Sequence, residues 1–262
     1  VIAADEGVMP QTREHLDICR LLGVEHGLVA LTKADMVDEE WLELVSDDVT
    51  EYLSGTFLEN APIVPVSSVK GDGIADLIKA LDDMAASLDE QPASGPFRLP
   101  VDRVFTMKGF GTVITGTAIG GSVEVGQELM IYPQGLTSKV RGLQVHNQEE
   151  QRARRGQRTA VNLQGLDKEN IERGNVLATP GSLVPSLWLD LQIKVLEDAL
   201  RPIKHRAPIR FHAGSVEIMG RVLTLDRDEL KPGEQAFCQV RLDQPVALMA
   251  GDRYVLRSYS PV

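Results

Sequence analysis

The spacing of apolar residues changes once along the chain, and this change constrains the fold more than any other feature of the sequence. Up to about residue 90, short apolar runs at 1–4, 28–31 and 63–66 alternate with longer segments of helical period. Beyond about residue 97, short runs of alternating apolar and polar residues follow one another, separated by glycines. The first pattern predicts βαβ units with a parallel sheet, and the second predicts antiparallel barrels.

We therefore predict a multi-domain protein that combines an α/β part with an all-β part. The α/β part is expected over residues 1–91, and a linker rich in Pro, Gly and Ser over residues 92–97. A first antiparallel β-barrel is expected over residues 98–182 and a second over residues 183–262. The boundary between the barrels is placed where GSLVPS, at 181–186, interrupts the strand pattern.

Charge is distributed unevenly between these parts. Residues 1–95 hold 5 Lys and Arg against 20 Asp and Glu, a net of −15, and the rest holds 22 against 18, a net of +4. The later part can therefore meet phosphate although the whole chain is acidic. No apolar stretch approaches the roughly 20 residues of a membrane span, and the two distant cysteines fit no metal site. We expect a cytoplasmic protein without a membrane partner.

Polar residues follow two neighbouring strands of the α/β part. Thr32, Lys33 and Asp35 directly follow one apolar run, and Ser67 and Ser68 directly follow the next. The carboxyl ends of parallel strands meet at the edge where such folds bind ligands. There a carboxylate can accept both N1–H and the 2-amino group of guanine, which adenine cannot offer, while a lysine stem covers the base. The sequence predicts guanine recognition; a helix-capping Asp beside a solvated Lys is the alternative.

These motifs resemble those of the translational GTPase superfamily of elongation factor Tu. ADEGVMPQTREHL resembles the segment after its switch II, and RLPVDRVFTMKGFGTVITGTAIGGSVEVGQELMIYP resembles its second domain. Thr32 stands where the guanine motif of that superfamily usually has Asn. The resemblance implies the C-terminal half of a P-loop-type GTPase (G) domain, followed by two antiparallel β-barrels.

The same resemblance implies GTP or GDP as the ligand and GTP hydrolysis as a switch. It places the residues that hold the phosphates, Mg²⁺ and the hydrolytic water in an N-terminal half of the G domain, ahead of residue 1. We therefore predict neither a catalytic residue nor a metal site within the chain, and expect it to be inactive as a GTPase by itself.

Two details resemble one branch of the superfamily, the selenocysteine-specific elongation factors (SelB). Asp102 and Arg103 in VDRVF, and Arg158 in RRGQR, resemble residues that line the selenocysteyl pocket of that branch. A selenol is largely ionised at neutral pH, and guanidinium groups favour such an anion over neutral serine or over a cysteine thiol, whose pKa is about 8.5. Without the resemblance, these three residues would be interpreted as exposed surface charges.

The resemblance to this branch implies a factor that binds GTP and selenocysteyl-tRNA and delivers it to the ribosome at recoded UGA codons. It implies recognition of the mRNA selenocysteine insertion hairpin by winged helices placed after residue 262. Two other interpretations stay open. A general elongation factor or an initiation factor 2 gamma-like GTPase would not need the arginine pocket, and a non-enzymatic RNA-binding fragment would need no nucleotide.

Clustered cations supply candidate RNA surfaces, because contact with a phosphate backbone needs positive charge in no particular order. The residues predicted to contact tRNA from the second barrel are Arg201, Lys204, Arg206 and Arg210. A second cluster, in the first barrel, consists of Arg152, Arg154 and Arg155. A solvated loop is the alternative for either cluster.

Overall fold

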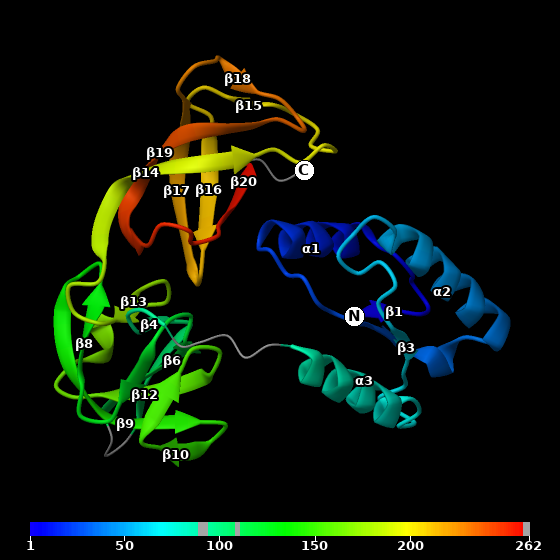
Figure 1. The fold of residues 1–262 in the computed structure, drawn as a ribbon, viewed down its shortest axis with the longest axis horizontal. Coiled ribbons are helices and arrows are strands. Elements are labelled where there is room, and N and C mark those ends of the chain that lie inside the picture. The colour runs from blue at the N-terminus through cyan, green and yellow to red at the C-terminus, as the bar shows by residue number, and fades with distance from the viewer. Residues whose placement is uncertain (89–93, 108–110, 259–262) are drawn as a thin grey trace. The chain divides into compact units, whose positions relative to one another are not determined.

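A computed structural model describes residues 1–88, 94–107 and 111–258 of the chain. The chain forms two compact units, Val1–Glu90 and Gln91–Val262, which we call unit 1 and unit 2 (Figure 1). Unit 1 holds a parallel sheet with helices, and unit 2 holds antiparallel sheets. The predicted combination of an α/β part with an all-β part is confirmed.

Unit 1 is built on a three-stranded parallel sheet with β2 at its centre. Its strands are β1 (Ile2–Ala3), β2 (Val29–Thr32) and β3 (Ile63–Pro65). Its helices are α1 (Pro10–Leu21), the 3-10 turn η1 (Ala34–Met36), α2 (Glu39–Leu53) and α3 (Ile74–Ser87). A helix follows every strand, as the alternating apolar pattern predicted.

The buried core of unit 1 lies against α1 and α2. Val45 and Val49 of α2 are four residues apart and are buried with Leu16 of α1 and Leu31 of β2. The spacing of four residues puts one apolar stripe on the core side of the helix. In Figure 1, α3 lies on the other side of the strands from α1, and none of its residues is buried. Most of the burial in unit 1 therefore comes from one face of the sheet.

The first barrel of unit 2 has the strand order β4-β13-β8-β9-β12-β6-β5, with β10 paired to β9. The strands along this path are β4 (Arg98–Pro100), β5 (Arg103–Met107), β6 (Gly111–Thr117), β8 (Glu128–Tyr132), β9 (Leu136–Val145), β12 (Arg158–Leu163) and β13 (Val176–Ala178). The remaining elements are β7 (Ser122–Glu124), β10 (Gln148–Glu150), β11 (Arg152–Arg154) and the 3-10 turn η2 (Lys168–Asn170).

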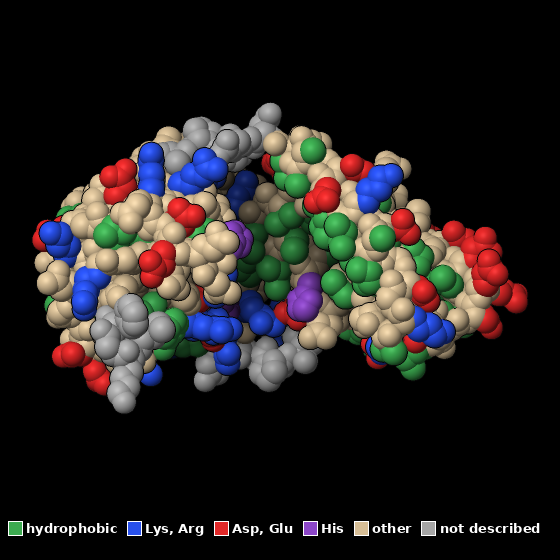
Figure 2. Space-filling model, turned by 90° about the horizontal axis from the view of Figure 1, so that it is seen from below, with side chains coloured by type: hydrophobic (Ala, Val, Ile, Leu, Met, Phe, Trp, Pro, Cys, Tyr) green, Lys and Arg blue, Asp and Glu red, His purple; other side chains and the backbone are tan. Residues whose placement is uncertain are grey.

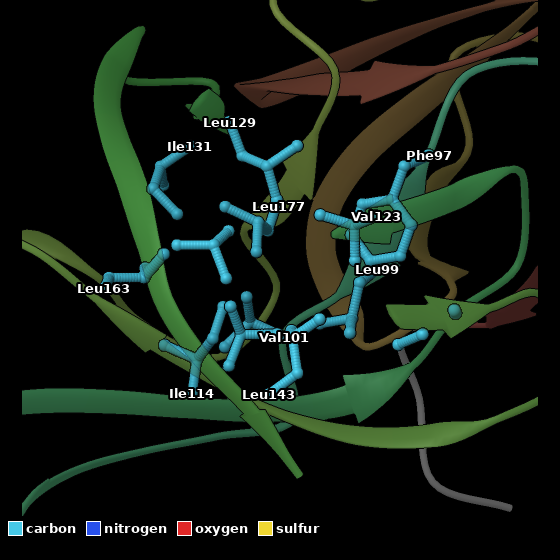
Figure 3. Close-up of a cluster of buried hydrophobic side chains, with 14 of the residues drawn as sticks. Phe97, Leu99, Val101, Ile114, Val123, Leu129, Ile131, Leu143, Leu163 and Leu177 are labelled. Atoms are coloured by element: carbon cyan, nitrogen blue, oxygen red, sulfur yellow. The ribbon is translucent and has the colours of Figure 1, made fainter. Parts of the chain in front are cut away.

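Alternate residues of these strands fill the interior of the first barrel. Leu99, Ile114, Ile131 and Leu177 come from four different strands, are fully buried and converge in Figure 3. Phe97 belongs to the same core although the predicted linker ran over residues 92–97. Of that segment, 92 and 93 lie outside the described residues. The predicted linker therefore extended too far at its C-terminal end. The Pro and Gly residues before Phe97 are typical of a linker, but burial of this aromatic side chain removes much apolar surface from water and makes it part of the barrel core.

The second barrel is formed around a five-stranded sheet of order β14-β19-β17-β16-β20. Its strands are β14 (Val184–Lys194), β16 (Pro208–Ala213), β17 (Val216–Thr224), β19 (Gln235–Leu248) and β20 (Val255–Ser258). Two short strands, β15 (Ile203–Lys204) and β18 (Glu229–Leu230), pair with each other. Phe211, Val222 and Val240 are fully buried in a core that is separate from that of the first barrel.

The two barrels contact each other within unit 2 through an ion pair beside a small apolar cluster. The guanidinium Nη1 of Arg98 lies 2.9 and 2.7 Å from the two carboxylate oxygens of Asp252, and both side chains are mostly buried. Tyr132, Leu183 and Ala247 form a separate buried cluster that joins residues of both barrels. A largely buried pair of this kind destabilises a structure strongly when one partner is removed.

The turn before α3 generates a prediction about the stability of unit 1. Gly73 has φ 71°, and a Cβ there would lie 2.0 Å from the carbonyl oxygen of Pro65. Gly71 has φ 85°, and a Cβ there would meet nothing within 4 Å. Gly71→Ala should cost about 1–2 kcal/mol of unfolding free energy from the left-handed backbone alone. Gly73→Ala should cost clearly more, because the end of β3 must also move.

Urea unfolding measures both costs, followed by the fluorescence of Trp41 in a Trp188→Phe background. These are the two tryptophans of the chain, and Trp41 lies in α2. Equal destabilisation by the two glycine substitutions would contradict the close approach at Gly73.

Candidate functional site

The chain segments that follow β2 and β3 are held side by side. In the parallel register Leu31 is paired with Pro65, and the N–H of Val66 donates to the carbonyl of Leu31 at 2.8 Å. Beyond the strands, the N–H of Ala34 donates to the carbonyl of Val66 at 3.2 Å. The two polar loops predicted to meet guanine therefore form one edge.

Asp35 and Ser67 are brought together at this edge. The hydrogen bond from Ser67 lowers the pKa of Asp35 and outweighs the opposing effect of partial burial. Ser67 is fully buried, and its hydroxyl also accepts the N–H of Lys70 at 3.0 Å. Asp35 is half-exposed, so its ionised carboxylate is available to a ligand as a double acceptor.

Lys33 has a carboxylate partner that the sequence analysis missed. Its Nζ lies 3.0 and 2.8 Å from the two carboxylate oxygens of Asp5, and Glu6 is 3.8 Å away. The hydrogen bond to Asp5 is the main cause that raises the pKa of Lys33. A signal was present in the sequence, since Asp5 follows the first apolar run as Lys33 follows the second. The ion pair ties the end of β1 to the end of β2.

Thr32 and Ser68 are placed differently from the other predicted guanine-binding residues. The hydroxyl of Thr32 donates to the carbonyl of Ile2 in β1 at 3.2 Å, so the sheet holds it. The side chain of Ser68 is exposed in the loop after β3. Guanine recognition by this edge stays a prediction, with Asp35 and the buried Ser67 as its best-defined part.

A second set of predicted residues meets on the first barrel. The guanidinium of Arg158 in β12 donates through Nη1 to Asp102 Oδ2 at 2.5 Å and through Nη2 to Oδ1 at 3.3 Å. The hydroxyl of Thr115 in β6 donates to the same Oδ1 at 2.7 Å. Thr115 was not predicted, because only the pairing of β6 with its neighbours brings it to Asp102. The three side chains form one network, which we call the Asp102 network.

The electrostatics of the Asp102 network favour an ionised carboxylate. Burial raises the pKa of Asp102, but the hydrogen bonds from Arg158 and Thr115 together with nearby positive charge lower it further than burial raises it. Arg103 contributes to this lowering through space. It is exposed on β5, with its Cα paired with that of Thr115. The structure therefore brings Asp102, Arg103 and Arg158 into one electrostatic environment.

Arg158 keeps binding capacity beyond its contact with Asp102. Its side chain is 53% exposed, compared with 29% for Asp102. A guanidinium has more N–H donors than the two that this carboxylate accepts, and the carboxylate fixes its plane. With Arg103 beside it, the arrangement can bind an anion at the barrel surface. Among the described residues, no group of three or more His, Cys, Asp and Glu is placed to hold a metal ion.

The predicted tRNA-contact residues are all exposed. Arg206 has a left-handed backbone with φ 63°, and Lys204 lies in the short strand β15. Arg210 is paired with Glu217 at 3.2 Å, and Arg201 lies in the segment before β15. Contact of these residues with tRNA stays a prediction.

The second basic cluster follows one short strand and the turn after it. Arg152 donates to the hydroxyl of Ser122 at 2.9 Å, and Arg154 and Arg155 are exposed beside it. The acidic excess lies elsewhere: Figure 2 shows Asp and Glu side chains gathered at the right-hand end, in unit 1. The acidic excess that the sequence shows for the first 95 residues is thus also visible on the surface of unit 1.

Three family models match successive parts of the chain. Residues 1–87 match the elongation factor Tu GTP binding domain, and residues 111–178 match elongation factor Tu domain 2. Residues 190–261 match the β-barrel domain of selenocysteine-specific elongation factors. The matches follow the order of the α/β unit and the two barrels.

Individual proteins agree with these models. The chain is 55% identical over all 262 residues to a selenocysteine-specific elongation factor of Desulfomicrobium baculatum and covers 41% of its length. The crystal structure of a bacterial selenocysteine-specific elongation factor, EF-Sec, has a TM-score of 0.86 and 32% identity, over 99% of this chain and 42% of that one. Elongation factor SelB from Methanococcus maripaludis, in its apo form, has a TM-score of 0.86 and 25% identity, over 98% of this chain and 60% of that one. The chain spans less than two thirds of each relative.

The Asp102 network generates a prediction about proton affinity. Arg158→Gln removes two charge-assisted hydrogen bonds to the Asp102 carboxylate and should raise its pKa. Arg103→Gln is the matched control, since it removes the same charge from the same barrel surface without a hydrogen bond to Asp102. It should raise the pKa less. Titration of the Asp102 carboxyl carbon by NMR measures both shifts.

The sign of the pH dependence follows from the lowered pKa. Asp102 stabilises the folded state above its unfolded pKa, and this contribution is lost as the pH falls through its folded pKa. Arg158→Gln should therefore make stability less dependent on pH in the acidic range. Equal pKa shifts in the two variants would mean that the hydrogen-bonded fork is absent in solution.

Proposed function

Because the chain belongs to the family of selenocysteine-specific elongation factors, we propose that the protein carries selenocysteyl-tRNA in a GTP-dependent manner. It delivers this tRNA to the ribosome at recoded UGA codons in the cytoplasm. The observation that carries the proposal is the Asp102 network, which presents an exposed, fixed guanidinium beside Arg103. The mRNA insertion hairpin is a further partner of the whole protein.

The arginines select the cargo through its charge. A selenolate is an anion at neutral pH, whereas the hydroxyl of a seryl group is neutral and most of a cysteinyl group is still a thiol. Arg158 and Arg103 gain a charge-assisted hydrogen bond with the selenolate, and the neutral groups do not offer one. Asp102 and Thr115 hold the guanidinium of Arg158 in place, so less side-chain freedom is lost on binding.

Guanine recognition makes the carrier responsive to GTP. Asp35 accepts two hydrogen bonds from the base, and the buried Ser67 keeps the carboxylate ionised and oriented. The stem of Lys33 covers the base while Asp5 fixes its ammonium group. The nucleotide supplies a γ-phosphate, and the loops ordered by that group change the affinity for tRNA.

Mg²⁺ accompanies the nucleotide in the whole protein. The residues of this chain contribute the base-recognition edge, and GTP hydrolysis is a property of the whole protein.

A general elongation factor or an initiation factor 2 gamma-like GTPase would carry a neutral aminoacyl group, and a non-enzymatic RNA-binding protein would need no guanine. The Asp102 network favours the selenocysteine-specific function over these alternatives.

None of the helices within the described ranges has the length and apolar content required to cross a bilayer.

The choice of cargo is tested on the full-length protein with GTP. The rates of hydrolysis of the selenocysteyl, seryl and cysteinyl esters of the same tRNA are compared. Selective protection of the selenocysteyl ester is expected. Arg158→Ala should reduce the affinity for that ester by about 10- to 100-fold, the effect of losing a hydrogen bond to a charged group.

Lys139→Ala is the matched control, because it removes an exposed cation from the same barrel outside the Asp102 network. It should leave protection unchanged. Equal protection of all three esters, unaffected by Arg158→Ala, would instead support a carrier of neutral aminoacyl groups.

The guanine edge is tested by changing Asp35 to Asn in the full-length protein. An amide donates where the carboxylate accepts, so the affinity for guanosine diphosphate should fall by at least about 100-fold. Xanthosine diphosphate, which has a carbonyl in place of the 2-amino group, should bind to the Asp35→Asn variant more tightly than to the unchanged protein. Nucleotide affinity measured by calorimetry gives both values.

Asp38→Asn is the control, since Asp38 caps α2 and Asn caps helices about as well. It should bind both nucleotides as the unchanged protein does. Unaltered guanosine diphosphate binding by Asp35→Asn would remove Asp35 from the site.

A further inference from the structure

The outer face of the second barrel carries a row of side chains that the proposed function does not use. The strand registers pair Trp188 of β14 with Arg241 of β19, and Arg241 with Arg221 of β17. We call these three residues the arginine row. Their Cα atoms form a line across three adjacent strands of one sheet.

The arginine row faces outward because the alternate positions of the same strands face the core. Val240 and Val222, each next to an arginine of the row, are fully buried. The two arginines are exposed, and Trp188 is 46% exposed. All three side chains are therefore open to a partner in solution.

The two arginines carry like charges on directly paired positions. Such pairs destabilise a sheet, because opposite positions on one face bring the side chains together. Arg210 on the same sheet is paired with Glu217 at 3.2 Å. In contrast, among the described residues no carboxylate lies within salt-bridge distance of Arg221 or Arg241. The row thus concentrates positive charge that the described residues leave unneutralised.

Two further contacts hold the charged groups in place. The guanidinium carbon of Arg241 lies 5.8 Å from the ring centroid of Trp188, within the range of a cation–π interaction. Nη1 of Arg221 donates to the main-chain carbonyl of Arg206 at 3.2 Å. The row therefore combines an oriented guanidinium, a second one anchored to the neighbouring turn, and an exposed aromatic ring.

We propose that the arginine row binds the phosphate backbone of a single-stranded segment of RNA, with a base stacked on Trp188. Guanidinium groups bind phosphate through paired hydrogen bonds, and an exposed aromatic ring at the end of the row accepts a base of any sequence. An acidic polypeptide would satisfy the charge but would leave the indole without its stacking partner. The inference goes beyond the proposed function, since it requires neither guanine nucleotide nor an aminoacyl group.

Trp188 reports binding directly once the other tryptophan is removed. In the chain with Trp41→Phe, a 12-nucleotide oligoadenylate should quench the fluorescence of Trp188. The affinity should fall as salt rises from 50 to 200 mM, because binding of phosphates by cations releases counterions. Arg221→Gln with Arg241→Gln should reduce the slope of log affinity against log salt by about 1.4, or about 0.7 for each arginine that no longer binds a phosphate of a single strand.

The matched control removes two cations from the first barrel. Lys139→Gln with Arg141→Gln changes the net charge equally, and both residues are exposed on β9. It should leave the salt slope unchanged. A second measurement uses the anisotropy of labelled oligoadenylate with Trp188→Ala, which should weaken binding by roughly 5- to 100-fold because one base can no longer stack.

Several outcomes would overturn the inference. They are absence of quenching by oligoadenylate, equal slopes for the two double variants, and tighter binding of polyglutamate than of the RNA. The last outcome would assign the row to an acidic protein. Each of them would leave the ester-protection test of the Asp102 network intact, because that network lies on the other barrel.

Discussion

The parallel pairing of β3 with β2 is the constraint on which the predicted guanine-binding edge of unit 1 depends. Once Leu31 is paired with Pro65, the residues that follow the two strands must leave the sheet at the same edge. The turn at Gly73 then lies close to the end of β3, where only a glycine fits against the carbonyl of Pro65. A shift of one residue would exchange the two faces of the strand and move Ser67 out of its buried position beside Asp35.

Much of the fold could be predicted from local features of the sequence. The helix Glu39–Leu53 follows the helical spacing of its apolar residues, and it begins after Asp38, whose side chain caps it. The change to alternating runs near residue 97 likewise indicated barrels, since period 2 is a property of each strand alone. The buried position of Phe97 was missed, because the composition around it is that of a linker.

The parts that could not be predicted depend on contacts between distant residues. Arg98 and Asp252 are 154 positions apart, and no local pattern relates them. Asp102 and Arg158 were singled out from a resemblance, and the structure adds the carboxylate–guanidinium fork that joins them. Thr115 has no signal of its own, since its role exists only once β6 is paired. Register, not composition, therefore decides which polar residues become a site.

The arginines of unit 2 show how burial and neutralisation together separate structural residues from binding residues. Arg98 is mostly buried and donates through Nη1 to both carboxylate oxygens of Asp252, so its charge joins the two barrels away from solvent. Arg158 is engaged by Asp102 but remains half-exposed, so it is oriented and still able to meet an anion. Arg221 and Arg241 are exposed with no carboxylate partner among the described residues, and their like charges lie at directly paired positions. Arginines with the same intrinsic chemistry thus differ in function according to how far each guanidinium is already satisfied within the fold.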